Sequence, residues 1–142
     1  MTKKDYKTLE LDPKYVPKKT EEYMCDMQRA YFYRTLSDQR NEIVASMDDI
    51  METINLSTKN KTAGIGDELD SSSFDIEANI QLKTHARSLN LLREIDMALE
   101  RLDHGKFGFS IISGDEIGLK RMLARPLAKL TIEEQEEHEK AE

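Results

Sequence analysis

The sequence is poor in the residues that build disulfides, cysteine metal sites and membrane spans. Its 142 residues include one cysteine, Cys25, and no tryptophan. A single cysteine excludes an intrachain disulfide and any zinc or iron–sulfur site made of several cysteines, and it suits a reducing compartment. No apolar run approaches the roughly 18–20 residues of a membrane span, and no apolar run follows the N-terminal lysines as in a signal peptide. We therefore expect a cytoplasmic protein without a membrane partner.

Basic residues are outnumbered by acidic ones, 21 to 28, which gives a net charge of −7. Binding of duplex DNA relies on a basic footprint, so we expect no specific DNA binding. The chain is 35% charged and 38% hydrophobic, against about 25% and 45–50% in average domains. Such a chain cannot fill a thick globular core, but it can fill the thin seam between two long helices.

Residues that break helices are also scarce, since the chain has three prolines and six glycines. Between Lys18 and His104 the only breakers are Gly64 and Gly66, which favours two long helices joined by a turn. Apolar residues recur at helical spacings on both sides of this turn, which predicts one seam-forming stripe on each helix. The stripe residues are Phe32, Leu36, Ile43, Met47, Ile50 and Ile54, then Phe74, Ala78, Leu82, His85, Leu89, Leu92, Ile95, Leu99 and Leu102.

We predict an all-α fold in which a long antiparallel helical hairpin, a coiled coil, stands on a small globular base. The first helix is expected to begin at an N-cap, Thr20, and the second near a cap at Ser72. Thr131 and Glu134 have the spacing of a capping box, which predicts a short C-terminal helix over 132–140.

We predict that the chain divides into three parts. Residues 1–19 form an irregular leader, 20–104 form the hairpin with its tip near 59–72, and 105–142 form the base with the C-terminal helix; residues 20–31 also pack on the base. The apolar residues expected to build the base are Phe107, Phe109, Ile111, Ile112, Ile117, Leu119, Met122, Leu123, Leu127 and Leu130.

Charge is segregated along this predicted fold. Residues 63–77, around the tip, include five acidic residues and no lysine or arginine, whereas residues 105–129 include five basic and two acidic residues. Acidic side chains near the start of a helix are favoured by the helix dipole. The acidic tip is therefore explained either by this local effect or by a functional role, and spacing alone leaves both open.

Five short motifs occur in a consistent order over roughly residues 20–140. They are Glu21-Glu-Tyr-Met24, Phe32-x-x-x-Leu36-x-x-x-Arg40, Asp67-x-x-Asp70, Phe107-Gly-Phe109 and Gly114-x-x-Ile-Gly118-x-x-Arg121-x-x-Ala-Arg125-Pro126. Together they resemble the DksA/TraR family, whose members bind bacterial RNA polymerase. The resemblance implies a transcription regulator of the stringent-response type, not an enzyme, whose coiled coil enters the secondary channel of polymerase and modulates open-complex stability and initiation.

The resemblance also implies which residues meet the polymerase. The family's tip motif falls on Asp67, Asp70 and Ser72, where serine replaces the family's alanine. An arginine that contacts the rim of the channel in the family falls on Arg87.

The metal site of the best-known family members is degenerate in this sequence. Their four cysteine positions fall on Ser110, Ser113, Thr131 and Glu134. These residues cannot form a four-cysteine zinc site. The chain is therefore similar to the cysteine-poor, zinc-independent branch of the family, and we expect no metal and no cofactor.

A second departure concerns the nucleotide ppGpp, which binds at the polymerase interface in the family. Arg125 matches the arginine of that site, and the resemblance implies that Arg121 and Arg125 contact ppGpp or the polymerase. The two lysine positions of the site, however, fall on Glu94 and Gln135. A polyphosphate requires cations. The resemblance therefore implies that ppGpp is at most a weak effector.

Two other functions stay open at this point. One is a Gre-type factor, whose acidic tip stimulates transcript cleavage by polymerase; the other is a coiled-coil interaction or oligomerisation module. We expect a monomer, because the hairpin closes its seam within one chain. His85 is predicted to be a packed polar residue of that seam rather than a ligand.

Overall fold

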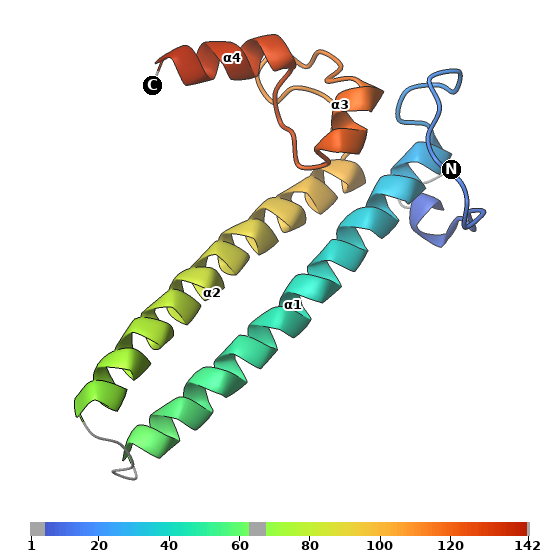
Figure 1. The fold of residues 1–142 in the computed structure, drawn as a ribbon. Helices are drawn as coiled ribbons and strands as arrows, with labels where there is room; N and C mark the ends of the chain where they lie inside the picture. The colour runs from blue at the N-terminus through green and yellow to red at the C-terminus, as the bar shows by residue number, and fades with distance from the viewer. Residues whose placement is uncertain (1–4, 63–67, 142) are drawn as a thin grey trace. The chain divides into compact units, whose positions relative to one another are not determined.

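The computed structural model describes residues 5–62 and 68–141, apart from the side chains of 5, 54 and 57–74. Its elements are the 3-10 helix η1 (Asp5–Thr8) and the α-helices α1 (Asp26–Thr62), α2 (Glu68–Asp103), α3 (Leu119–Ala124) and α4 (Ile132–Ala141) (Figure 1). Within these residues no strand forms beyond an isolated bridge between Phe109 and Glu116. The predicted all-α fold with two long packed helices and a short C-terminal helix is confirmed. None of the described helices is long and apolar enough to cross a membrane.

The chain forms two compact units. We call Met1–Asp38 with Glu94–Glu142 the base unit, and Gln39–Arg93 the hairpin unit. Helices α1 and α2 each contribute residues to both units, since the division falls inside them.

Helix α1 begins later than expected, at Asp26 rather than at Thr20. The carboxylate of Glu21 accepts hydrogen bonds from the Lys18 backbone N–H at 2.8 Å and the Tyr15 hydroxyl at 2.9 Å, which fixes a turn instead of a helical start. Met24 then adopts φ +54°, a left-handed conformation that an α-helix does not contain. The predicted cap at Thr20 is therefore wrong.

Helix α2 begins earlier than expected, at Glu68, so Ser72 is an interior residue rather than the cap. Helix α1 continues to Thr62, and residues 63–67, between the two helices, lie outside the described residues. The predicted tip near 59–72 therefore consists largely of helical residues.

The seam of the hairpin unit is more polar than predicted. Ile43, Met47 and Ile50 of α1 are half-buried as expected. On α2, however, Leu82 and Leu89 are 50% and 39% exposed. The half-buried positions among the described side chains of α2 in this unit are the predicted Ala78, His85 and Leu92 together with Gln81 and Ser88. These five positions keep the alternating three- and four-residue spacing of a seam.

The base unit contains the apolar core. Phe32 and Phe107, from opposite ends of the chain, are buried with ring centroids 5.2 Å apart. The predicted core residues Ile117, Leu119 and Met122 are also buried. Ile111 and Ile112, by contrast, are 61% and 72% exposed, so the prediction that they belong to the core is wrong.

The leader expected to be irregular includes one ordered element. In η1, Tyr6 is 2% exposed, and its hydroxyl donates a hydrogen bond to Asp103 Oδ1 at 2.7 Å. Lys7 Nζ lies 3.0 Å from the same oxygen. The Arg29 guanidinium stacks over the Tyr6 ring at 4.3 Å and donates to the Leu102 carbonyl at 2.6 Å. Residues 5–8 are therefore part of the base unit, fastened to the end of α2.

Candidate functional site

The structure describes only some of the residues of the predicted acidic tip. Asp67 lies outside the described residues. Asp70 and Ser72 belong to α2, but their side chains also lie outside the description. Their functional role therefore stays a prediction.

The three predicted arginines differ in how they are engaged. Arg87 is exposed on α2 within the hairpin unit. Arg121, in α3, is half-buried, and its Nε donates a hydrogen bond to the Leu130 carbonyl at 3.2 Å. Arg125 follows α3 and its side chain is exposed. Arg121 thus holds the chain after α3, whereas Arg87 and Arg125 present their charges to solvent.

The four residues at the family's zinc-ligand positions, Ser110, Ser113, Thr131 and Glu134, come together around the carboxylate of Glu134. The Ser110 hydroxyl donates to Glu134 Oε2 at 2.8 Å. The Thr131 and Ser113 hydroxyls donate to Glu134 Oε1 at 2.9 and 3.2 Å. We call these four residues the Glu134 cluster.

Backbone groups complete the Glu134 cluster. The Ser110 hydroxyl oxygen accepts hydrogen bonds from the N–H groups of Ile112 and Ser113, at 3.1 and 3.3 Å. The Gly114 N–H donates to the Ser110 carbonyl at 3.0 Å, and its φ of +79° is a left-handed value that glycine adopts without strain. The Glu134 N–H donates to Thr131 Oγ1 at 3.2 Å, so the predicted capping box forms.

The chemistry of this cluster is that of a hydrogen-bonded junction. Donation from Ser110, and further from Thr131 and Ser113, lowers the pKa of the Glu134 carboxyl because these bonds favour its charged form. Three neutral hydroxyls and one carboxylate do not fit zinc, whose structural sites use thiolates and imidazoles. Among the described residues, no group of three or more His, Cys, Asp or Glu side chains could hold a metal ion.

Sequence reasoning missed the part played by Tyr23. Its hydroxyl donates to the Gly108 carbonyl at 2.5 Å and accepts from the Gly118 N–H at 3.2 Å, and burial raises its pKa. A Cβ at Gly108 would lie 2.8 Å from Met24 Cε and 2.9 Å from the Tyr23 hydroxyl. The signal was present in the Glu-Glu-Tyr-Met and Phe-Gly-Phe motifs, which are far apart in sequence and meet here.

Comparison with known proteins identifies the family of the chain. Residues 28–102 match the family model described as "DnaK suppressor protein DksA, N-terminal domain". The chain is 33% identical over 128 residues to the RNA polymerase-binding transcription factor DksA of Caulobacter vibrioides, covering 90% of this chain and 87% of that relative. This chain belongs to the DksA family. The relative of the same description from Escherichia coli K12 is 31% identical over 119 residues, with coverages of 84% and 76%.

A solved structure of the DksA family shares the fold. The transcription factor DksA2 from Pseudomonas aeruginosa aligns with a TM-score of 0.75 at 35% sequence identity, covering 84% of this chain and 88% of that chain. The family-model match ends at residue 102. The Glu134 cluster therefore lies outside the part of the chain that the family model covers.

Proposed function

We propose that this chain binds bacterial RNA polymerase and regulates transcription initiation, without catalysing a reaction of its own. The observation that supports the proposal most strongly is the likeness, over 84–90% of the chain, to curated relatives described as RNA polymerase-binding transcription factors. The site of action would be the bacterial cytoplasm, where the polymerase works.

The proposed mechanism places the tip of the hairpin in the secondary channel of polymerase. Asp67 and Asp70, with Ser72 beside them, would approach the catalytic metal and the mobile elements around it, while Arg87 meets the channel rim. Carboxylates so placed act by favouring one polymerase conformation over another, which shifts the stability of the open complex. The exposure of Arg87 on α2 supports its part in this arrangement.

The charges of the base unit favour weak control by ppGpp. Arg125 is exposed and available to a phosphate, but Glu94 on α2 is exposed as well and would repel one. We propose that the chain acts as a monomer, without specific DNA contacts, and that the Glu134 cluster replaces a structural zinc.

The decisive experiment is in vitro transcription from a ribosomal-RNA promoter, with a polymerase pull-down alongside. We compare wild type with an Asp67→Asn/Asp70→Asn variant and with Asp48→Asn/Asp49→Asn, which removes two exposed charges from α1 instead. Wild type and the α1 control are expected to inhibit, whereas the tip variant is expected to bind polymerase without inhibiting. Stimulated transcript cleavage in a stalled complex would instead favour the Gre-type function, and absence of polymerase binding would refute the proposal.

A further inference from the structure

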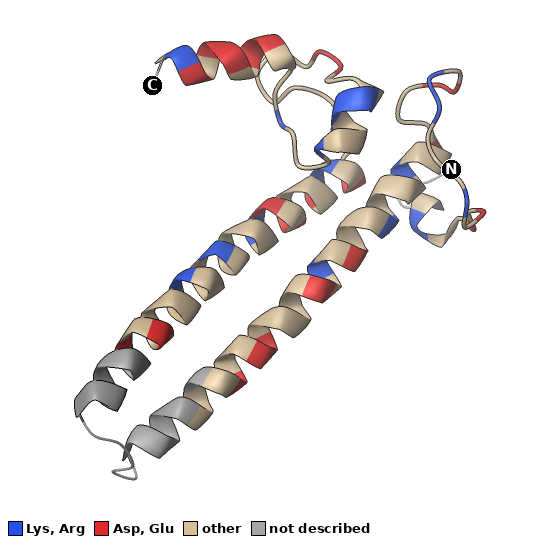
Figure 2. Cartoon of the chain, viewed as in Figure 1, with Lys and Arg blue, Asp and Glu red and all other residues tan. Residues whose placement is uncertain are grey.

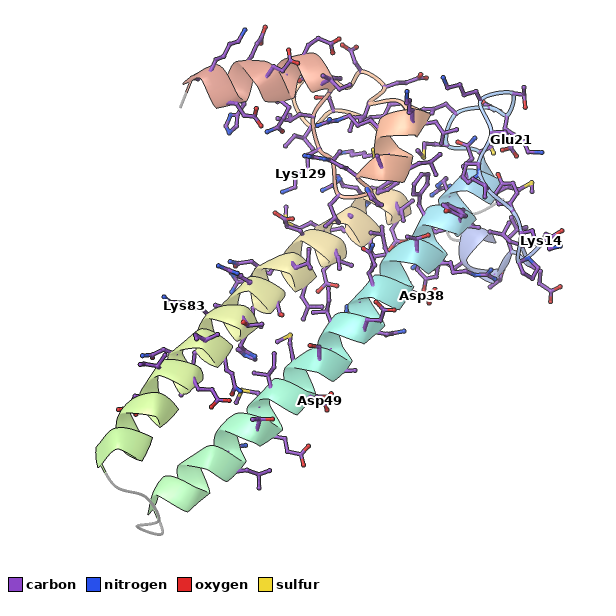
Figure 3. The ribbon with its side chains drawn as sticks, in the orientation of Figure 1. Lys14, Glu21, Asp38, Asp49, Lys83 and Lys129 are labelled. Carbon is purple, nitrogen blue, oxygen red and sulfur yellow. The ribbon has the colours of Figure 1, made fainter. Side chains whose placement is uncertain are left out.

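The base unit includes a pocket between the segment that leads into α1 and the loop that follows α2. Its volume is about 240 Å³, and it is partly open to solvent. Glu21, labelled in Figure 3, belongs to the segment that leads into α1. The pocket is lined mainly by aromatic and other large side chains, and its lining residues are Tyr23, Met24, Arg29, Gly105, Phe107 and Phe109. All of them belong to the base unit.

The aromatic walls of the pocket are held by contacts with one another and with the core. The Tyr23 ring meets the Phe109 ring edge to face, with centroids 5.5 Å apart, and the Tyr23 hydroxyl donates to the Gly108 carbonyl. Phe107 is 2% exposed and packs on Phe32. The rings cannot fill the space between them without breaking these contacts, so the pocket is preformed, as small-molecule sites usually are.

Two backbone features distinguish this pocket from a gap in packing. Apart from its chain neighbours, a Cβ at Gly105 would meet no atom within 4 Å, so there is open space beside this residue. Met24 adopts φ +54°, a conformation that residues other than glycine rarely adopt and that is concentrated at functional sites. Folded proteins contain few voids larger than a water molecule. A pocket of this size beside a strained residue is therefore a candidate ligand site.

The lining of the pocket favours a neutral aromatic ligand. Aromatic rings pair well with other rings, and thioether and guanidinium groups attract rings as well. Arg29 does not favour an anion, because its Nη1 lies 3.6 Å from Asp26 Oδ1, whose charge compensates the guanidinium. Residues 107–114 include no charged side chain, and Figure 2 shows this loop in tan after the end of α2. An apolar cavity of about 150 Å³ can hold benzene, so this larger pocket suits two fused rings.

We propose that the base unit binds a small, neutral, fused-ring aromatic molecule of the size of indole in this pocket. The inference goes beyond the proposed function, because it assigns a small-molecule site to the unit that is not proposed to enter the polymerase channel. The ligand would contact Met24 before α1 and Phe109 after α2 at the same time. Its binding is therefore expected to stabilise the base unit, since a ligand that binds only the folded state raises the stability of that state.

The test uses the full-length chain and indole as the probe. The chain has no tryptophan, so the fluorescence of indole can be followed without a tryptophan background from the protein. We expect saturable binding with a dissociation constant on the order of 0.1–1 mM, as suits a ligand of this size, and a higher thermal midpoint with saturating indole. Indole-3-carboxylate, which adds a negative charge to the same rings, should bind about tenfold or more weakly, because burial of a charge without a partner is costly.

Two pairs of variants test whether the probe occupies the pocket. Gly105→Asn adds an amide side chain in the open space, and asparagine tolerates the left-handed φ of +71°. Gly114→Asn is its matched control, since Gly114 has φ +79° and equally open space but does not line the pocket. Phe109→Leu removes one ring of the wall, and its control, Tyr33→Leu, removes a ring that does not line the pocket. We expect the pocket variants to raise the dissociation constant about fivefold or more, and the controls to change it less than about twofold.

Several results would overturn the inference. Binding of indole to wild type without saturation, or equal affinity of either pocket variant and its control, would refute the site. Tighter binding of indole-3-carboxylate than of indole would refute the neutral ligand. Circular dichroism checks that each variant folds, and if Gly105→Asn does not fold, the comparison of Phe109→Leu with Tyr33→Leu decides. None of these results depends on polymerase binding, so this inference and the proposed function can be refuted separately.

Discussion

The base unit buries eleven apolar side chains almost completely, whereas no described side chain of the hairpin unit is fully buried. Burying one large apolar side chain contributes roughly 1.5–3 kcal/mol. The free energy of folding is therefore concentrated where the two ends of the chain meet. The hairpin unit keeps most of its surface in solvent, where a partner can reach it.

Polar contacts follow the same division. In the base unit, long-range hydrogen bonds fasten residues near the N-terminus to the end of α2 and the loop after it, through Tyr6, Tyr23 and Arg29. In the hairpin unit, Gln81, His85 and Ser88 occupy seam positions. Such polar seam residues fix the register of two helices at a cost in stability. These differences in burial and polar contacts predict that the hairpin unit opens locally while the base unit stays folded.

The largest effect should come from the core of the base unit. Phe32→Ala removes a fully buried ring that packs on Phe107, and we expect a loss of about 3–5 kcal/mol in the free energy of unfolding. The control is Met47→Ala in the half-buried seam, for which we expect less than about 1.5 kcal/mol because less surface is buried. Urea unfolding followed by circular dichroism measures both. Equal losses of unfolding free energy in the two variants would show that the seam of the hairpin unit contributes as much to stability as the core of the base unit.

A smaller effect is expected from the hydroxyl of Tyr23. Tyr23→Phe leaves the Gly118 N–H without its partner, while the Gly108 carbonyl still accepts from the Ile117 N–H at 2.9 Å. Because this hydrogen bond is only part-buried, we expect its loss to lower the free energy of unfolding by about 1 kcal/mol. The matched control is Tyr33→Phe, since the Tyr33 hydroxyl forms no hydrogen bond with another described residue, and we expect a change within about 0.5 kcal/mol. Similar urea midpoints for both variants would contradict the role assigned to Tyr23.

The Glu134 cluster should stabilise α4 more than it stabilises the rest of the base unit. No residue of α4 is buried, so the hydrogen bonds of Glu134 replace an apolar attachment. We expect Glu134→Gln to increase amide hydrogen exchange across α4 and to leave α1 protected. Glu137→Gln removes the same charge from an exposed position of α4 and should change little.

Lowering the pH should have the same effect on wild type as Glu134→Gln has at neutral pH, because both remove the charge of Glu134. The pKa of Glu134 is lowered below its ordinary value of 4.5 in the folded chain. Its contribution to stability is therefore fully present above pH 4.5 and is lost as the pH falls through the lower, folded value. Protection of the α4 amides, taken relative to the exchange rate of an unstructured peptide at the same pH, should fall over that range in wild type and be less sensitive to pH in Glu134→Gln. The same pH dependence of protection in both would exclude Glu134 as the titrating group.

Helical spacing was enough to predict the two long helices, because each stripe of apolar residues has to face the other helix. It was not enough to find the helix ends. The Glu21 carboxylate and the left-handed Met24 delay α1, and neither has a periodic signal. It also could not separate seam from surface among the leucines of α2, since Leu82 and Gln81 are adjacent and packing against α1 decides which one is covered.

The candidate site divides in the same way. Local spacing predicts the capping box of Thr131 and Glu134, and the structure confirms it. That Ser110 and Ser113 would share the carboxylate of that box depends on a loop closing over more than 20 residues. Local patterns do not encode such a closure, and only the family resemblance placed the four positions together.

The smallest expected effect is a gain, in the seam of the hairpin unit. His85 is half-buried there, and its Nδ1 is buried without a hydrogen-bond partner among the described residues. Because an unsatisfied buried polar atom is costly and leucine suits a seam position, His85→Leu should stabilise the unit by up to about 1 kcal/mol. Slower hydrogen exchange over 78–92, without a change in the base unit, is the expected result. Thr84→Leu, which places the same side chain on an exposed neighbouring position, should give no such gain; if it did, helix propensity rather than the seam would be the cause.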